Sequence, residues 1–306
     1  MNQTPPNNTT STYAIDAHTF EAGAMAPGLY VVATPIGHLG DITLRALSVL
    51  AGADAIACED TRVTGKLLHH YAIATPMSPY HEHNAARQLP KLMARLADGA
   101  AIALVSDAGT PLLSDPGYRL VGAAIENDFP VIAVPGASAL LAGLVASGLE
   151  TDTVLFAGFL PPKQGARRRR IEQIGAIDST IVLYETPRRV GSVLADMAEI
   201  LGNDRRAVIA RELTKSFESL YRGSLADLRT IVETMPKKGE LVLLLAPPTE
   251  QTAPADEVDR LLLDALSRLP ASAAAREVAA STGVERQQLY RRALAFKESA
   301  SSGKQE

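Results

Sequence analysis

Short runs of Val, Ile, Leu and Ala recur along the chain, and each is followed by a turn-rich motif and then by a helical pattern. Runs that are apolar at consecutive positions are typical of strands in a sheet covered on both faces. Their alternation with helices indicates right-handed βαβ units and an α/β fold. We expect strands at residues 29–33, 54–58, 101–105, 131–134, 153–157, 180–184, 207–210 and 241–245.

The pattern breaks near the middle of the chain and again near its end. We interpret the polar stretch at residues 147–152 as the boundary between two tandem α/β domains, residues 27–148 and 149–248. From residue 249, apolar side chains at helical spacing predict a small helical domain that extends to residue 306. In it, Thr282-Gly283-Val284 predicts the turn of a helix-turn-helix. A plain helical hairpin that packs on the body or on a partner subunit fits equally well.

The first 26 residues are rich in Thr, Asn and Pro, have no cationic start and contain no continuous apolar run. We therefore expect a disordered leader and not a signal peptide. The longest apolar stretches elsewhere are too short to span a membrane, which favours a soluble protein. The single cysteine, Cys58, fits a reducing cytoplasm.

The net charge constrains the partners. With 30 Lys and Arg against 34 Asp and Glu, the chain carries a formal charge of -4. This balance excludes a uniformly basic nucleic-acid-binding protein, but it leaves room for a local basic patch.

Turn motifs with chemically useful side chains follow the predicted strands directly. In open α/β sheets, ligands bind beyond the carboxyl ends of the strands. We therefore expect a ligand cleft at this edge, between the two halves. The motifs occupy residues 34–37, 59–62, 106–111, 135–138, 185–188 and 212–215.

The motifs also indicate the class of ligand. The dinucleotide pattern G-x-G-x-x-G and the phosphate loop ending in G-K-[ST] are both absent, which disfavours hydride transfer and nucleotide hydrolysis. The loop that starts at Ser106 offers small residues and the acceptor Asp107, which suit a ligand with a ribose, an amino group and a cationic centre. Taken alone, these residues fit a purely structural turn equally well.

Taken in order, the motifs resemble the RsmI-type ribosomal RNA small subunit methyltransferases of the tetrapyrrole methylase superfamily. The resemblance covers residues 29–245 and extends to the terminal helices. The chain departs from the family pattern at His38 and Arg188, where many members have Asn and His. The motifs that carry the resemblance are LYVVATPIGHLGDITLRAL, CEDTR, YHEHN, VSDAGTPLLSDPGYRLV, PGASAL, FAGFLPPK, YETPRR, RELTKSFE and KGELVLL.

The resemblance implies 2'-O-methylation of a cytidine ribose in 16S rRNA near the decoding centre, with S-adenosylmethionine as the cofactor. It also implies a homodimer and a cofactor cleft between the two α/β domains. The cofactor-binding residues that it implies are Pro35, Asp107, Gly109, Thr110, Ser138, Ala139, Tyr184, Leu213, Gly239 and Glu240.

A ribose hydroxyl is a poor nucleophile until it loses its proton, so this chemistry calls for a general base. Glu59, Asp60 and Glu185 qualify by their place at the strand edge, and Lys66 or Lys215 would qualify if desolvation lowered its pKa. A local salt bridge that orders the loop explains the Glu59-Asp60-Arg62 group equally well. The chemistry needs no metal, and we interpret His81 and His83 as surface or RNA-contacting residues.

RNA binding requires cations, and the sequence concentrates them in one place. Lys163 and Arg167, Arg168, Arg169 and Arg170 precede an apolar turn, where the helix dipole disfavours positive charge. We expect a phosphate-contacting patch here, with a merely solvated charge run as the alternative. We expect the patch to extend to Arg62, Arg188 and Arg189.

Two other functions remain open. A methylase of a small tetrapyrrole or of a modified protein side chain would share the fold, but it would not need the arginine run or the terminal helices. A non-catalytic RNA-binding or ribosome-assembly factor would use the cleft only as structure. Binding of S-adenosylmethionine separates the last of these from the two enzymes.

Overall fold

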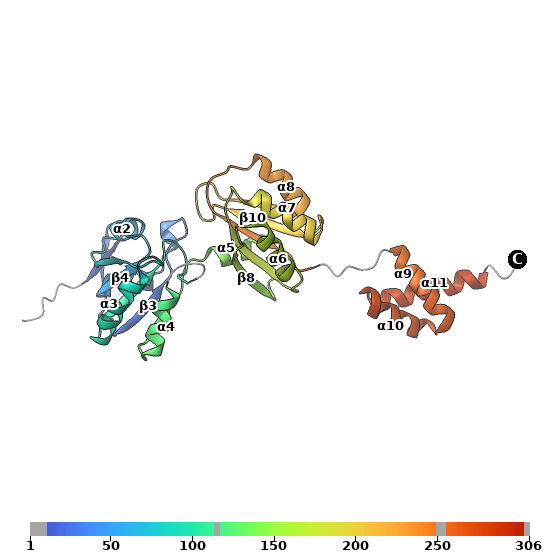
Figure 1. The fold of residues 1–306 in the computed structure, drawn as a ribbon, viewed down its shortest axis with the longest axis horizontal. Helices are drawn as coiled ribbons and strands as arrows, with labels where there is room; N and C mark the ends of the chain where they lie inside the picture. Colours follow the sequence, from blue (N-terminus) through green and yellow to red (C-terminus); the bar gives the residue numbers. More distant parts are fainter. Residues whose placement is uncertain (1–10, 113–116, 249–254, 303–306) are drawn as a thin grey trace, which may run out of the picture. The chain divides into compact units, whose positions relative to one another are not determined.

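The computed structural model describes residues 11–112, 117–248 and 255–302. The chain divides into two compact units, residues 1–247 and 248–306. The first unit contains two five-stranded sheets, and the second contains three helices (Figure 1). No helix among the described residues has the length and apolar character needed to cross a membrane.

The first sheet is entirely parallel, in the order β5-β4-β6-β3-β7. Its central strands are apolar on both faces because both faces are covered by helices. Helices α1 and α2 cover one face, and α3 and α4 cover the other. The elements are β3 (Gly28–Val32), α1 (Leu44–Gly52), β4 (Ala55–Cys58), α2 (Thr61–His70), β5 (Met77–Pro79), α3 (Ala85–Ala97), β6 (Ala101–Val105), α4 (Tyr118–Glu126) and β7 (Val131–Val134).

The second sheet is mixed, in the order β11-β10-β12-β9-β8, and only β8 and β9 are parallel. Helices α6, α7 and α8 cover one face. The elements are β8 (Val154–Phe159), α6 (Gln164–Gly175), β9 (Thr180–Glu185), α7 (Val190–Leu201), β10 (Arg206–Arg211), β11 (Ser219–Ser224), α8 (Leu225–Thr234) and β12 (Leu241–Leu245).

Helix α5 (Ala139–Ser147) covers the other face of the second sheet. Gly143 makes this close approach possible, because a Cβ at this position would lie 3.1 Å from Val242 Cγ1. Helix α5 therefore packs as part of the second half, although it precedes the predicted boundary at residues 147–152. The buried cluster between α5 and the second sheet also includes Leu213 and, from a loop of the first half, Ile36.

Part of the predicted leader is structured. Residues 1–10 lie outside the described part, but β1 (Thr12–Ile15) and β2 (His18–Glu21) form an antiparallel hairpin. Tyr13 is 8% exposed and stacks on Phe20, and Ala14 N donates to Tyr71 O. The expectation of disorder is therefore wrong for this stretch, because two aromatic side chains and a backbone bond hold it on α1 and α2.

The second unit consists of α9 (Ala255–Arg268), α10 (Ala271–Thr282) and α11 (Arg286–Ser302). The predicted turn is present: Gly283 has a φ of 69°, a conformation that glycine adopts at little cost. Small residues such as Ala274 and Ala275 are fully buried and let the helices pack closely. An ion pair of 2.8 Å between Arg292 and Asp259 joins the last helix to the first.

Candidate active site

A cavity of about 350 Å³ lies at the carboxyl edge of the first sheet, against the second sheet. Loops that follow β4, β6, β9 and β10 reach it, as expected for a ligand site of an α/β fold. We call it the main cavity. It is lined by Ile36, Glu59, Asp107, Ala108, Gly109, Thr110, Ala139, Phe159, Tyr184, Glu185, Thr186, Ala210, Leu213, Gly239, Glu240, Leu241 and Val242.

Backbone bonds fix the loops of the first half. Thr34 N donates to Gly109 O and Gly109 N donates to Thr34 O, both at 2.9 Å. Thr110 Oγ1 donates to Ala137 O at 3.2 Å and ties in the next loop. Gly109 has a φ of 76°, and a Cβ there would lie 3.3 Å from Ile36, so this turn favours glycine. The backbone around the cavity is therefore held in place by the fold itself.

The second half contributes an aromatic wall. The ring of Tyr184 lies edge-on to Phe156 at 4.9 Å and to Phe159 at 5.8 Å between centroids. Leu213 is buried beside this group, in a loop whose neighbours Glu212 and Thr214 have positive φ angles of 52° and 62°. Positive φ at residues other than glycine is uncommon and is concentrated at functional sites.

The main cavity is acidic. Four of its lining residues are carboxylates, namely Glu59, Asp107, Glu185 and Glu240, and none is Lys or Arg. Burial raises the pKa of Glu59, and the nearby charge of Asp107 raises it further. Burial likewise raises the pKa of Asp107, although Asp60 N donates to its Oδ1 at 3.0 Å and opposes the shift. Such a cavity attracts a cationic ligand and repels a phosphate.

The carboxylate of Asp60 is engaged by groups at the start of α2. It accepts from Arg62 N at 2.8 Å, which caps α2, and it pairs with the Arg62 guanidinium at 2.6 Å. These bonds lower the pKa of Asp60 to about 2. The local salt bridge considered for this group therefore exists, and it leaves Glu59 outside the pair.

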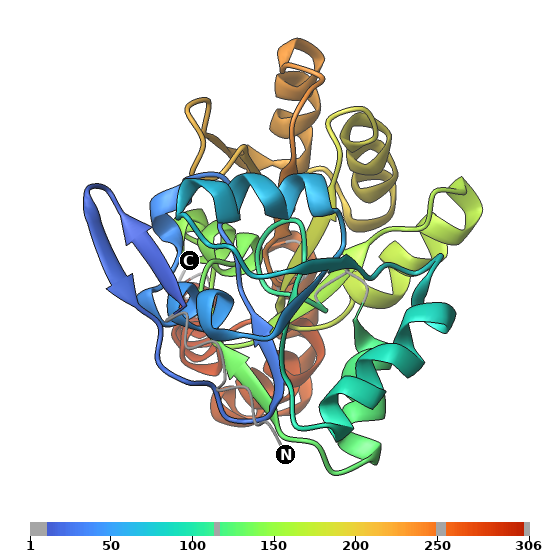
Figure 2. The same cartoon turned by 90° about the vertical axis from the view of Figure 1, so that its left-hand side faces the viewer.

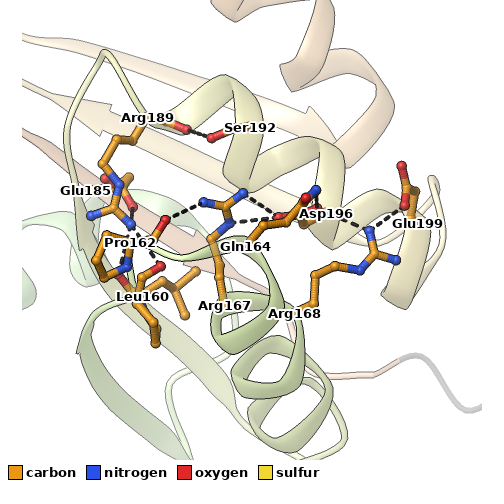
Figure 3. A network of polar contacts seen from close by, with 11 residues as sticks. Leu160, Pro162, Gln164, Arg167, Arg168, Glu185, Arg189, Ser192, Asp196 and Glu199 are labelled. Atoms are coloured by element: carbon orange, nitrogen blue, oxygen red, sulfur yellow. Dashed lines mark hydrogen bonds and ion pairs between the residues drawn. The ribbon is translucent and has the colours of Figure 1, made fainter.

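Glu185 also has partners. Its Oε1 accepts from Thr186 N at 2.8 Å, and its Oε2 lies 3.4 Å from Arg189 Nη2 without forming a hydrogen bond. On β9, Tyr184 packs with the cluster on the α5 face, so strand alternation directs Glu185 toward the α6 and α7 face. The close-up in Figure 3 shows its side chain beside Arg189.

A second cavity of about 300 Å³ adjoins the first, and Ile36, Asp107, Ala108 and Glu240 line both. Two lysines line only the second cavity. Lys66 is exposed on α2, while Lys215 pairs with Glu212 and Glu240 at 2.9 Å each. The other lining residues are Thr34, Pro35, Gly37, Leu39, Val63, Thr64, Leu67 and Ser106.

All predicted cofactor residues except Pro35 and Ser138 line the main cavity. Pro35 lines the second cavity, and Ser138 lines a third cavity, of about 370 Å³, beside α5. Sequence reasoning missed Ile36, Phe159 and Ala210. The first two lie within motifs that the sequence singled out, beside Pro35 and Leu160, and adjacency to these motifs was the available signal.

The arginine run is divided between two environments, and Figure 3 shows the side chains of its paired members, Arg167 and Arg168. Arg167 is buried and pairs with Asp196 of α7 at 2.6 Å. Arg168 pairs with Asp196 at 3.1 Å and with Glu199 at 2.5 Å. Arg169 and Arg170 are exposed and form no ion pair with the described residues.

The remaining predicted RNA contacts also differ in exposure. Lys163 is exposed at the N-cap of α6, and Arg188 is exposed just before α7. Arg189 donates to Leu160 O at 2.8 Å and so ties the start of α7 to the end of β8. Arg62 is 87% exposed despite its pair with Asp60. His81 and His83 lie 6.0 Å apart between ring centroids, and the described residues contain no cluster of three or more potential metal ligands.

Comparison with known proteins identifies the family. The family model of tetrapyrrole (corrin/porphyrin) methylases matches residues 28–229, and the model of the RsmI C-terminal HTH domain matches residues 252–297. A protein of Mesorhizobium japonicum named ribosomal RNA small subunit methyltransferase I is 50% identical, over 92% of this chain and 96% of its own. The chain belongs to the ribosomal RNA small subunit methyltransferase I family of tetrapyrrole methylases.

Other members of the family are similarly close. The proteins of that name from Vibrio cholerae and Synechocystis are 46% and 44% identical, each over 87% of this chain and over 94% and 97% of their own. Among solved structures, a cobalt precorrin-4 methyltransferase has a TM-score of 0.56 at 17% identity, over 71% of this chain and 94% of its own. A uroporphyrin-III C-methyltransferase of Thermus thermophilus, complexed with S-adenosyl homocysteine, has a TM-score of 0.52 at 16% identity, over 71% of this chain and 96% of its own. These likenesses show the shared fold.

As a member of this family, the chain is an S-adenosylmethionine-dependent methyltransferase. The residues of the main cavity fit that cofactor. Its sulfonium and ammonium groups are cationic, and the cavity offers four carboxylates with no Lys or Arg. Its adenine is flat and largely apolar, and Tyr184, Phe159 and Leu213 offer matching surface.

Proposed function

We propose that this chain methylates the 2'-oxygen of a cytidine ribose in 16S rRNA, in the decoding region of the small ribosomal subunit. The observation that carries the proposal is the near full-length similarity to relatives named ribosomal RNA small subunit methyltransferase I, with 50% identity to the first. The predicted sequence motifs support it, since they occupy the loops that line the main cavity. The proposed substrate is made and used in the cytoplasm, where we place the activity.

The cofactor, when bound, supplies a methyl group that is already electrophilic because it is attached to a sulfonium. The protein must therefore bind the cation, orient the ribose and remove one proton. Orientation of two reactants can lower a barrier by roughly 7–11 kcal/mol, and a positioned base adds roughly 10²–10⁴-fold. The loop around Gly109 is fixed by backbone hydrogen bonds, and Asp107 lines both cavities. Both features help to orient the ribose relative to the cofactor.

We assign the role of general base, which accepts the proton of the ribose hydroxyl, to Glu59. It lines the main cavity, forms no ion pair with the described residues, and has a raised pKa that makes its carboxylate a stronger base. The pairs around Asp60 and Glu185 make both poorer acceptors. Burial alone would lower the pKa of Lys215, but hydrogen bonds to Glu240 and Glu212 raise it and keep this ammonium charged. Lys66 lines only the second cavity and not the main cavity, in which Glu59 lies.

Two measurements test the proposed function. Calorimetry with S-adenosylmethionine should show binding, whereas a non-catalytic assembly factor would show none. Small subunits from a strain that lacks the enzyme, incubated with labelled cofactor, should acquire label at the 2'-oxygen of one cytidine. Unlabelled rRNA would refute the proposal and would leave the tetrapyrrole or protein-side-chain methylase as the alternative.

We also propose that the chain forms a homodimer through the outer face of α5. Leu141 and Val145 of this helix are 55% and 79% exposed, which is unusual for large apolar side chains on one surface. They lie on one helix face, four residues apart. The double variant Leu141→Glu with Val145→Glu should shift the mass measured by light scattering from dimer to monomer, and an unchanged mass would contradict this interface.

A further inference from the structure

We propose that the outer face of helix α2 and the second cavity beneath it bind the rRNA backbone next to the target nucleotide. This inference rests on the proposed function and names the surface on which the substrate lies. It concerns Arg62 and Lys66 on α2 and Lys215 across the cavity. The sequence predicts an RNA surface centred on the arginine run of α6, with Arg62 as an extension of it.

The first argument is the distribution of charge between the two cavities. The main cavity has carboxylates and no Lys or Arg, whereas every lysine that lines either cavity lines the second one. The second cavity also has the carboxylates of Asp107 and Glu240, and Lys215 pairs with Glu240, so Lys66 is the lysine of its wall that forms no ion pair with the described residues. A cationic cofactor is thereby directed to the main cavity, and an RNA phosphate to the side of the second cavity that Lys66 borders. The two spaces meet at Asp107 and Glu240, which line both. An RNA ribose that entered the second cavity would meet the cofactor at this junction.

The second argument is the arrangement of cations along α2. Arg62 and Lys66 are four residues apart, so they project from one face of the helix, and His69 and His70 continue that exposed face at its last turn. Figure 2 shows α2 crossing the side of the first half that is turned to the viewer. Lys66 belongs both to this face and to the wall of the second cavity.

The third argument is that Lys66 is available. Lys66 forms no ion pair with the described residues, in contrast to Lys215, which is held between Glu212 and Glu240. Within the part of the chain that the structure describes, Arg62 pairs only with Asp60, and its side chain remains 87% exposed. A long cationic side chain that borders a cavity and has no internal partner is suited to a phosphate.

One end of the second cavity is closed where the two halves of the first unit meet. Across the cavity, Gly37 touches the second half: a Cβ there would lie 2.5 Å from Lys215 Cγ and 2.8 Å from Thr214 Oγ1. His38 N also donates to Thr214 Oγ1 at 3.1 Å. This glycine lets the two halves close one end of the cavity without a side chain between them.

The experiment compares Lys66→Met with Lys66→Arg and with the control Lys91→Met. Lys91 is an exposed lysine of α3 that lines neither cavity, so its removal changes the net charge equally. Steady-state methyl transfer is measured with small subunits from a strain that lacks the enzyme, at several salt concentrations. Calorimetry gives the affinity of each variant for S-adenosylmethionine and confirms that it is folded.

We expect Lys66→Met to raise the KM for the subunit by about threefold to tenfold at low salt. Its dependence on log salt should fall by roughly 0.7–0.9, the loss of one phosphate contact. Lys66→Arg should restore most of the affinity, and cofactor binding should not change. If wild-type enzyme labels rRNA but Lys66→Met and Lys91→Met have the same KM and salt dependence, the inference is overturned while the proposed function stands. If wild-type enzyme labels no rRNA, the proposed function itself has failed.

Discussion

Helices α2 and α6 both begin after a strand has ended at the carboxyl edge of its sheet, and both carry arginine in the first two turns. In α6, consecutive arginines diverge: Arg167 is buried against Asp196, while Arg169 and Arg170 are exposed. In α2, Arg62 and Lys66 lie on one exposed face. The denser run in the sequence thus gives the less continuous surface.

The difference follows from helical geometry. Consecutive residues point about 100° apart around a helix axis, so a run of arginines is distributed over all faces. Residues four apart share a face. A cationic surface is therefore better predicted from spacing than from the number of charges in a window.

The helix that packs beside each cationic helix determines how many of its charges are neutralised. Asp196 and Glu199 are three residues apart on α7 and face α6, so they neutralise Arg167 and Arg168. On α2, the ion pair formed with the described residues is that of Arg62 with Asp60, and Lys66 forms none. The comparison assigns a structural role to the start of α6 and a substrate-facing role to α2.

The largest expected effect is the loss of kcat when Glu59, which immediately precedes the N-cap of α2, is replaced. It tests whether the reaction takes place at the α2 end of the site. If the reaction takes place at the α2 end, Glu59→Gln should lower kcat by roughly 10²–10⁴-fold, the usual contribution of a positioned base. Glu185→Gln, before α7, should have a far smaller effect because its carboxylate is held by Thr186 and Arg189. The measurement is single-turnover methyl transfer at saturating cofactor, and equal losses in both variants would break the comparison.

The role of Glu59 as the base also predicts how kcat depends on pH. Because burial raises the pKa of Glu59, its carboxylate form is complete only above that raised pKa. We expect kcat to increase with pH through a pKa above the usual Glu value of about 4.3, and then to level off. In Glu59→Gln this ionisation should be absent from the profile. A wild-type rate that falls over the same range would exclude Glu59 as the base.

The next effect is on stability. Asp196→Ala leaves the buried Arg167 guanidinium without its partner, and breaking such a pair typically costs about 3–5 kcal/mol of unfolding free energy. Denaturant unfolding measures it, and Glu199→Ala, at a side chain that is 62% exposed, is the matched control, with a cost of about 0.5 kcal/mol or less. A loss below 1 kcal/mol for Asp196→Ala would mean that α6 does not depend on this pair.

The pair also gives the stability a pH dependence. Burial alone would raise the pKa of Asp196, but hydrogen bonds from Gln164, Arg167 and Arg168 hold it below its usual value. A lowered carboxyl pKa stabilises the fold above the unfolded value of about 3.9, and this contribution is lost as the pH falls through the lowered pKa. Wild type should therefore lose more stability than Asp196→Ala on acidification.

The sequence predicts the fold well where local pattern and packing agree. All eight expected strands exist, with ends displaced by at most two residues, because apolar runs such as residues 101–105 are buried on both faces. It misses β5 and β11, whose residues are exposed or half-buried, include Pro79 and Gly223, and lack the apolar pattern. It also misses the hairpin at residues 12–21, which depends on Tyr13 packing against helices distant in sequence.

The site is predictable to a similar extent. Most of the expected cofactor residues meet at the main cavity, since parallel strands bring their carboxyl ends together. The separate positions of Pro35 and Ser138 could not be predicted, because they depend on how the two halves meet around Ile36. Nor does local sequence reveal that Asp196, beyond the following strand, pairs with Arg167.

A smaller effect tests the exposed part of α6. Arg169→Glu together with Arg170→Glu should weaken binding to small subunits by at most about fivefold at low salt, with cofactor affinity unchanged. Lys66→Glu, which reverses a single charge, should weaken it at least as much. Filter binding at two salt concentrations compares them. An α6 effect well above that of Lys66→Glu would return the main RNA surface to the arginine run.

The smallest effect belongs to Arg168. Its side chain is 34% exposed, and Asp196 keeps bonds from Gln164 and Arg167 when Arg168 is removed. Because partly exposed ion pairs contribute little, Arg168→Ala should cost less than about 1 kcal/mol of unfolding free energy. It should also leave the KM for small subunits unchanged, because this guanidinium is engaged with Asp196 and Glu199. An increase in that KM similar to the one expected for Lys66→Met would show that Arg168 leaves its carboxylates to contact RNA, and that the two helices differ less than their ion pairs indicate.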